Sequence, residues 1–307
     1  MLGIMLKQQK KVVAMAKIWY KLIFKQISPI HIGIFNYGVL SETRIFIPGW
    51  TIWGALVNKY GQHKGKEEYF EEGKKIFESI TCFYPKLEKE NKVLFPEYKN
   101  GEFYLGDYSE NEFRAKFTDV YVSTSIQPLS LTAKDESLHE IEVILPKSKM
   151  ADKKDKENVY WIGLLGIDED KKEEIKEFLE KNSNISVGGD SRYGLGNMKL
   201  DELVQLNEAA NDELTKWGIT EEGKLTFKED KILKNYFSIT DGFYDEIREG
   251  ERIFHVGTIE HVIIDYDFSS ARLKTEKSKI CVTPGSKIKV DRDCNYELIR
   301  GIFQMKS

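Results

Sequence analysis

Alternating apolar and polar residues mark the first convincing element of the chain. Between Lys17 and Phe24, large apolar residues occupy every second position, and lysines recur on the opposite side. A period of two is typical of a β-strand. Similar alternation, or a short apolar run, predicts further strands at residues 120–126, 138–145, 159–165 and 195–203.

Helical spacing occurs in three places. The Pro-Gly turn at 48–49 opens a predicted helix, in which apolar residues recur three and four positions apart until Gly61. The acidic stretch 66–80 predicts a second helix. Asp168 is placed to cap a third helix, which runs to Glu180 with its apolar residues on one face.

The order of these elements predicts an α+β fold. Strand, helix, strands, helix, strand is the order of the ferredoxin-like (RRM-like) motif, an antiparallel sheet with both helices on one face. Residues 82–116 interrupt it with prolines and glycines, so we expect an irregular insertion there.

The other face of such a sheet would be open and would carry Trp19 beside Lys21. RNA suits that pair, because bases stack on aromatic rings while phosphates meet ammonium groups. An ordinary half-exposed strand is the alternative interpretation.

The chain becomes β-rich after about residue 205. Strands are predicted at residues 252–256, 260–268, 286–290 and 296–303. We therefore divide the chain into residues 1–205 and a β-rich subdomain of residues 206–307, for which a second ferredoxin-like arrangement is one option.

Glycines punctuate the loop that follows the third predicted helix. They are Gly188, Gly189, Gly194 and Gly196. Glycine lets a backbone approach a ligand closely and adopt positive φ. A dinucleotide-binding loop would follow a strand and open a helix, and here that order is reversed. We interpret the loop as a grip for a nucleic-acid backbone, with Arg192 and Lys199 as its cations. A tight turn is the alternative.

The Pro-Gly turn is a second candidate anion site, because a helix N-terminus presents free amide donors. The residues expected to contact RNA here are Arg44, Pro48, Gly49 and Trp50. Gly54, inside the helix, costs roughly 1 kcal/mol relative to alanine, which suggests that another element or a ligand approaches it closely.

Together, the two glycine-containing segments resemble those of the RAMP (repeat-associated mysterious protein) superfamily of CRISPR-associated proteins. Members carry an Ile-Pro-Gly-Ser-Ser-Leu-(Lys/Arg)-Gly-like segment, matched by residues 47–56, and a Gly-Gly-x-x-x-x-Gly-x-Gly loop, matched by residues 188–196. The resemblance covers roughly residues 17–205. It implies an RNA-binding subunit of a type III CRISPR effector complex, with guide RNA and the other effector subunits as partners.

Departures from the family pattern refine that expectation. Trp50 replaces a small serine, and Trp53 replaces a cation. Type III backbone subunits also carry an aspartate before the Pro-Gly segment that supports target cleavage, whereas Glu42 is the only acid between His31 and Ile47 here. The resemblance therefore implies a subunit that holds RNA without cutting its target.

Two other functions stay open. CRISPR RNA-processing endoribonucleases of this superfamily often use a histidine, so His31 is the candidate catalytic residue of a metal-independent endoribonuclease. A structural adaptor, whose glycine loops serve only as turns, is the third possibility.

Composition and charge limit the possible functions of the chain without pointing to one of them. A net charge of −4 and a pI of about 5.9 weigh against nucleic-acid binding by the chain as a whole. Residues 1–30, however, contain lysines and no acid, which leaves open a local basic face or a solvated leader. The three cysteines lack metal-ligand spacing, and we predict no metal, no cofactor and a reducing cytoplasmic setting. No apolar stretch approaches the ~20 residues of a membrane span.

Overall fold

The structure combines helices with mainly antiparallel sheets, as the sequence predicts. The pairs of β3 (Leu40–Thr43) with β10 (His139–Ile144) and of β14 (Tyr236–Ser238) with β20 (Ile302–Met305) are parallel. The computed structural model describes residues 17–90, 92–149, 156–206, 211–225, 232–240, 254–267, 274–289 and 296–305. Within these stretches, no helix is both long enough and apolar enough to cross a membrane.

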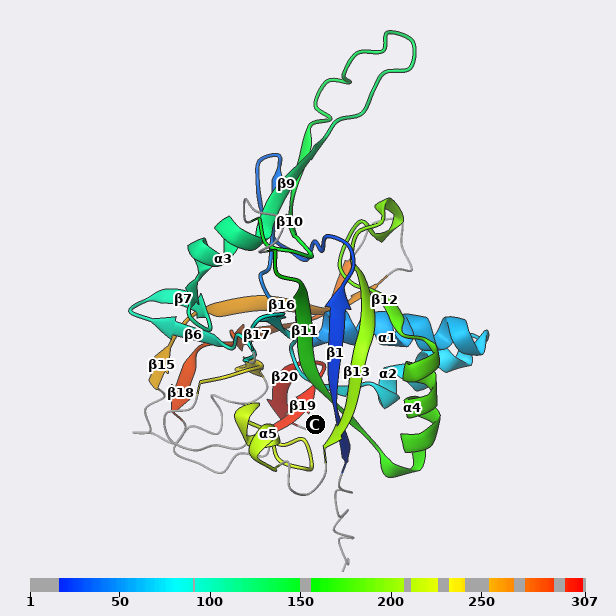
Figure 1. Ribbon diagram of the computed structural model, residues 1–307, viewed down its shortest axis with the longest axis vertical. Coiled ribbons are helices and arrows are strands. Elements are labelled where there is room, and N and C mark those ends of the chain that lie inside the picture. The colour runs from blue at the N-terminus through cyan, green and yellow to red at the C-terminus, as the bar shows by residue number, and fades with distance from the viewer. Residues whose placement is uncertain are drawn as a thin grey trace, which may run out of the picture.

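A six-stranded sheet built around the first strand organises the chain up to residue 206 (Figure 1). β1 (Ile18–Gln26) pairs antiparallel with β11 (Val159–Ile167) on one side and with β13 (Asn197–Leu206) on the other. The predicted strands at these three places are therefore present, with slightly different ends. The outer strands are β12 (Asn184–Ser186) beside β13, and β4 (Ser79–Ile80) and β5 (Tyr84–Leu87) beside β11.

Helices that connect the sheet strands pack against one another through aromatic rings. The ring of Tyr60 meets that of Phe178 edge-on, with 5.2 Å between centroids, and the Tyr60 hydroxyl donates to Glu174 at 2.8 Å. These contacts join the helix after β1 to the helix after β11. The helices are α1 (Gly49–Lys64), α2 (Glu68–Ile76) and α4 (Lys172–Lys181).

Asp168 was expected to cap the helix after β11, and it occupies a slightly different place. It precedes a 3-10 turn at Glu169–Lys171, which leads into α4. Its carboxylate accepts from Lys17 Nζ at 2.9 Å instead of capping a helix amide. The residue therefore ties the start of β1 to the start of the helix.

The expectation of an open sheet face at Trp19 and Lys21 is wrong. Residues 211–225, which include α5 (Asn211–Lys216), cover that end of the face. Trp19 is only 2% exposed, and its indole nitrogen donates to the Glu221 carbonyl at 2.8 Å. Lys21 Nζ donates to Glu213 at 2.9 Å. The ring has no free face for a base, and the lysine charge already has a partner.

A second sheet carries the most prominent projection of the molecule. Its order is β2-β3-β10-β9, and the β9–β10 hairpin extends well beyond the body (Figure 1). The predicted strands near 120–126 and 138–145 are present as this hairpin. The four strands are β2 (Gly33–Tyr37), β3 (Leu40–Thr43), β9 (Thr118–Ser123) and β10 (His139–Ile144).

Residues 82–116 are regular, contrary to the expectation of an irregular insertion. They include β5 of the main sheet, a three-stranded sheet and α3 (Glu110–Phe117). A capping box between Ser109 and Glu112 starts α3. Strands of two to four residues are too short to show a convincing alternation. The three-stranded sheet consists of β6 (Pro96–Lys99), β7 (Glu102–Leu105) and β8 (Tyr108–Ser109).

The β-rich pattern after residue 206 corresponds to a five-stranded sheet of order β16-β17-β14-β20-β19. The predicted strand at 296–303 is a hairpin that turns at Arg300 and Gly301, and two strands of this sheet had no prediction, β14 and β17. A two-stranded sheet lies beside it. The strands are β14 (Tyr236–Ser238), β15 (Phe254–Val256), β16 (Ile259–Asp267), β17 (Lys274–Val282), β18 (Lys287–Lys289), β19 (Tyr296–Ile299) and β20 (Ile302–Met305).

The Pro-Gly turn is where the C-terminal sheet packs on the rest of the chain. A Cβ built on Gly49 would lie 2.6 Å from the Cα and N of Gly301. The Arg300 guanidinium lies 3.8 Å from the centroid of the Trp53 ring. One cluster of buried residues runs through both parts of the chain. The division at residues 205 and 206 stays a prediction.

Gly49 lies at this contact and Gly54 does not, so replacing each by alanine should have opposite effects on stability. Gly49→Ala should lower the free energy of unfolding by about 1–3 kcal/mol, because its methyl group would overlap the Gly301 backbone. Gly54→Ala should raise it by about 0.5–1 kcal/mol, because a Cβ there meets nothing within 4 Å and alanine favours a helix. Urea denaturation of both variants checks this. A Gly49→Ala variant as stable as the parent chain would contradict it.

Candidate nucleic-acid interface

The glycine-rich loop lies between β12 and β13 and is pressed against residues 29–32. A Cβ on Gly188 would lie 2.1 Å from the His31 carbonyl oxygen, and one on Gly196 would lie 2.0 Å from the Val187 oxygen. Both glycines have positive φ, 77° and 81°. Side chains at these two positions would collide with backbone, so the glycines serve close packing within the chain.

Amides of this loop are used internally rather than offered to a ligand. Gly189 N donates to the His31 oxygen at 2.9 Å, Gly196 N donates to the Pro29 oxygen at 2.7 Å, and Gly194 N donates to the Ser191 oxygen at 3.0 Å. These three amides are therefore not available to the nucleic-acid backbone that the loop is expected to grip.

Arg192 and Tyr193 are the side chains that the loop turns outward. They belong to a 3-10 turn, Ser191–Tyr193, between the left-handed residues Asp190 and Gly194. The Tyr193 side chain is 86% exposed. Arg192 is exposed too, and it forms no ion pair with any residue that the structure describes. The turn therefore presents an exposed guanidinium beside an exposed aromatic ring.

Lys199 extends the cationic character onto the sheet. It is exposed near the start of β13, three residues after Gly196, and it lies opposite Lys25 in the register of β1 with β13. Lys25 Nζ lies 5.9 Å from the centroid of the Tyr160 ring. Two lysines thus occupy opposite positions on neighbouring strands at the end of the sheet that adjoins the glycine-rich loop.

A groove of about 990 Å³ separates this loop from the β9–β10 hairpin. Exposed apolar and aromatic side chains of the hairpin, such as Tyr121 and Val122, form one wall, and Tyr193 and Asp190 contribute to the other. Sequence reasoning identified the two strands but not the groove, because it did not pair them with the loop. The signal that could have revealed this wall of the groove was the apolar tip of the hairpin, between the two predicted strands.

That tip carries large apolar residues in full contact with solvent. They are Ile126, Leu129 and Leu131, and Leu129 is 97% exposed. A backbone bridge between Ile126 and Ala133, and a 2.8 Å hydrogen bond between the Thr124 and Ser137 hydroxyls, hold the two arms together. Exposed apolar residues on a projecting hairpin are typical of a contact surface.

His31 is buried and does not face the groove as a free base. The residue is 7% exposed; its ring Nδ1 donates to the Glu142 carbonyl at 2.7 Å, and Nε2 lies 3.3 Å from the Ser41 hydroxyl. Both ring nitrogens therefore have partners inside the protein. A general base for RNA cleavage would need an accessible nitrogen, so the geometry gives the His31 alternative no support.

The Pro-Gly segment lies outside the groove. Pro48 and Gly49 are buried, and Trp50 packs on Tyr236 with 4.8 Å between ring centroids. The Arg44 guanidinium forms an ion pair with Glu260 and donates to the Tyr236 hydroxyl at 3.0 Å. The expectation of an anion site at this helix N-terminus is wrong, because the C-terminal sheet occupies the space.

The structure thus brings together only some of the residues that were predicted to contact RNA. Arg192 and Lys199 are exposed; Arg192 directly precedes Tyr193 of the groove lining, but neither cation lines the groove itself. The four glycines shape the loop that carries Arg192. Trp19 and Lys21, as well as the residues of the Pro-Gly segment, pack inside the protein. Among the described residues, no group of three His, Cys, Asp or Glu side chains could hold a metal ion.

Comparison with known proteins places the chain in a family. The family model of the RAMP superfamily matches residues 23–199, more than half of the chain. No curated protein sequence matches.

Solved structures show a fold similar to that of this chain. One is a chain in the cryo-EM structure of the Type III-B Cmr-beta bound to cognate target RNA, with a TM-score of 0.55, 13% identity, and coverage of 87% of this chain and 86% of that one. Another comes from the Type III-B Cmr-beta bound to cognate target RNA and AMPPnP, with a TM-score of 0.52, 15% identity, and coverage of 88% and 85%. The match of the family model over most of the first sheet, together with its two glycine-containing segments, shows that this chain belongs to the RAMP superfamily.

Proposed function

We propose that this chain is an RNA-binding subunit of a type III CRISPR effector ribonucleoprotein, which holds guide RNA in antiviral defence and does not itself cleave the target. The observation that carries the proposal is the groove between the glycine-rich loop and the projecting hairpin, which is lined by the exposed Tyr193, the neighbour in the chain of the exposed Arg192. We infer a cytoplasmic particle in which the other partners are sister effector subunits.

The fold supports this proposal. We infer that residues 17–206 form a ferredoxin-like unit, because β13, β1 and β11 are consecutive neighbours with β4 and β5 beyond β11, and helices follow β1 and β11. The RAMP family and the resemblance to chains of the Type III-B Cmr-beta, solved with cognate target RNA, favour the same assignment.

The chemistry of the groove suits a single strand of RNA. Arg192 and Lys199 would neutralise phosphates, and Tyr193 offers a face on which a base can stack. The apolar wall of the hairpin would contact base faces, which are apolar above and below the ring. Such contacts do not depend on base identity, as holding a guide of variable sequence requires.

The absence of target cleavage rests on the residues before the Pro-Gly segment. Glu42, the only acid between His31 and Ile47, lies 2.7 Å from an Arg114 nitrogen, so its carboxylate is held by a contact within the protein. The buried His31 ring weighs against the endoribonuclease alternative. The adaptor alternative finds support in the Pro-Gly segment, which serves packing, but it leaves the exposed Arg192 and Tyr193 without a role.

The first prediction on this function concerns charge. An Arg192→Ala, Lys199→Ala double variant should bind single-stranded guide RNA more weakly, and the slope of log K against log salt should fall by about 1.4, as expected for two lost phosphate contacts. The matched control is a Lys66→Ala, Lys176→Ala variant, which removes the same charge from exposed positions of the helical side. Fluorescence anisotropy over a range of salt concentrations measures both. Equal slopes in all three proteins would favour the structural adaptor.

Stacking can be separated from charge at Tyr193. Tyr193→Ala should weaken RNA binding by about 1–3 kcal/mol without changing the salt slope, whereas Tyr193→Phe should bind like the parent chain. The phenylalanine variant keeps the ring and loses only the hydroxyl. If both variants bind equally well, the ring does not contact a base.

Cleavage has its own test. The purified chain, incubated with CRISPR repeat RNA without metal, should leave the RNA intact, because His31 is buried and both of its ring nitrogens contact groups inside the protein. Gel electrophoresis of labelled RNA detects cutting. A unique cut that disappears in His31→Ala would overturn this part of the proposal in favour of the processing endonuclease.

A further inference from the structure

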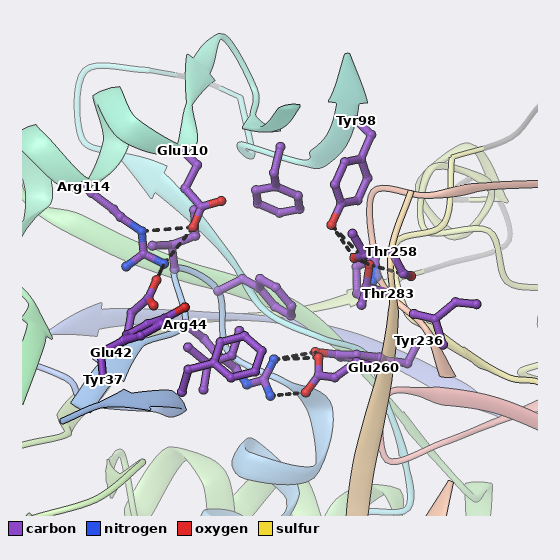
Figure 2. Close-up of a pocket in the computed structure, with 17 residues that line it drawn as sticks. Tyr37, Glu42, Arg44, Tyr98, Glu110, Arg114, Tyr236, Thr258, Glu260 and Thr283 are labelled. Atoms are coloured by element: carbon purple, nitrogen blue, oxygen red, sulfur yellow. Dashed lines mark hydrogen bonds and ion pairs between the residues drawn. The ribbon is translucent and has the colours of Figure 1, made fainter. Parts of the chain in front are cut away.

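A second hollow, of about 380 Å³, lies at the junction of the β2–β3 hairpin, the β6–β7 strands, the start of α3 and the edge of the C-terminal sheet (Figure 2). It shares no lining residue with the groove beside the glycine-rich loop. The proposed RNA function leaves it without a role.

Aromatic rings line much of this pocket. Phe35 and Tyr37 stand on β2 with ring centroids 6.3 Å apart, and both are more than half exposed. Tyr98 and Phe103 stand on β6 and β7 and meet edge-on at 5.3 Å. Rings that remain exposed in this way have faces available for a ligand.

Carboxylates outnumber cations around the pocket. The Arg114 guanidinium is within 2.7 Å of Glu42 and of Glu110, and within 2.6 Å of Glu142. One positive charge therefore faces three negative ones. Figure 2 shows Glu42 and Glu110 converging on Arg114 at one side of the pocket.

Arg44, the second cation of the pocket lining, adds no net positive charge. Arg44 pairs with Glu260 alone, and Figure 2 shows this pair across the pocket from Arg114. Its charge is therefore neutralised. Burial works against the charged form of Arg44, but Tyr236 and Glu260 outweigh it and raise the pKa, so the arginine stays charged. No lysine lines the pocket, so the negative surplus beside Arg114 is not compensated there.

A surplus of carboxylates beside open aromatic faces fits a cation. A guanidinium can donate to carboxylates and lie flat on a ring at the same time, which is a favourable setting for arginine. A phosphate would meet net negative charge, so RNA is disfavoured as the occupant.

The strands around the pocket favour a protein segment over a free amine. β2 and β16 each stand at the end of their sheet in the described structure, so each has a side without a strand partner. Such edges can accept an extended segment of another chain. Exposed Ile259 of β16 and Phe35 of β2 would contact apolar residues that flank the basic one.

We propose that this pocket binds an arginine side chain on an extended segment of a partner protein. The inference rests on the proposed function only in taking that partner to be a neighbouring effector subunit. The arginine would offset part of the negative surplus at Glu42 and Glu110 and would stack on the exposed rings of β2.

The test uses the full chain and a defined probe, the peptide acetyl-Thr-Val-Arg-Val-Thr-amide, in calorimetric titrations. Binding should weaken at least tenfold when citrulline replaces arginine, since citrulline keeps the shape and loses the charge. Glu110→Gln and Tyr37→Ala should each weaken binding at least fivefold. Glu102→Gln, an exposed acid of β7 outside the pocket lining, should leave it unchanged.

Each contrary outcome overturns the proposal. Failure of the arginine peptide to bind at millimolar concentration, or equal binding of the citrulline peptide, would do so. Spermidine binding as tightly as the peptide would show a site for free polyamines. A fall in RNA affinity in Glu110→Gln or Tyr37→Ala would assign the pocket to RNA. Because Arg192 and Lys199 are intact in these variants, failure here leaves the RNA function untouched, and failure of the RNA function leaves peptide binding measurable.

Discussion

The satisfaction of backbone hydrogen bonds by residues 29–32 is the constraint on which the arrangement of the molecule depends. This short segment leaves β1 and passes between the glycine-rich loop, β10 and the end of β3. Its carbonyl oxygens accept from the amides of Gly196, Ile144, Gly189 and Arg44, at 2.7 to 2.9 Å. The His31 ring adds a bond to the Glu142 carbonyl. Buried backbone groups are costly when unpaired, so these bonds fix where three separate elements can lie.

The two glycine-containing segments therefore do related work in different places. In the loop, Gly188 and Gly196 have no side chain because backbone lies about 2 Å from where a Cβ would be. At the start of α1, Gly49 has none because Gly301 is equally close. The glycines of both segments allow close packing of backbone within the chain. The proposed RNA binding therefore rests on side chains that this packing leaves exposed, above all Arg192 and Tyr193.

The net charge of −4 hides two surfaces of opposite character. Arg192 of the glycine-rich loop and Lys199 near the start of β13 are exposed cations, whereas the pocket at the edge of β2 holds more carboxylates than cations. A polyanion and a cationic side chain would accordingly be drawn to different parts of the molecule. Screening limits each field to about 10 Å at moderate salt, so local distribution outweighs the total.

Local patterns in the sequence identified the longest strands and helices. They also identified the two segments that need glycine, the Pro-Gly turn and the glycine-rich loop, and through these segments the family. Alternation is reliable in β1 and β10, because it extends over several residues, and helical spacing identified α1. The capping box at Ser109 and Glu112 was also readable and would have predicted α3. The short strands of residues 82–116 had no such signal, since two to four residues cannot establish a period.

Tertiary structure alone decided which surfaces are covered. Trp19 is buried by residues about two hundred positions away, and Gly49 is covered by Gly301. Neither neighbour leaves a mark on the local pattern, because a strand face looks the same in sequence whether solvent or another segment lies over it. The groove and the acidic pocket likewise arise where distant elements meet. Local chemistry thus determined what each segment could do, and packing between distant segments decided which of those side chains remained free to do it.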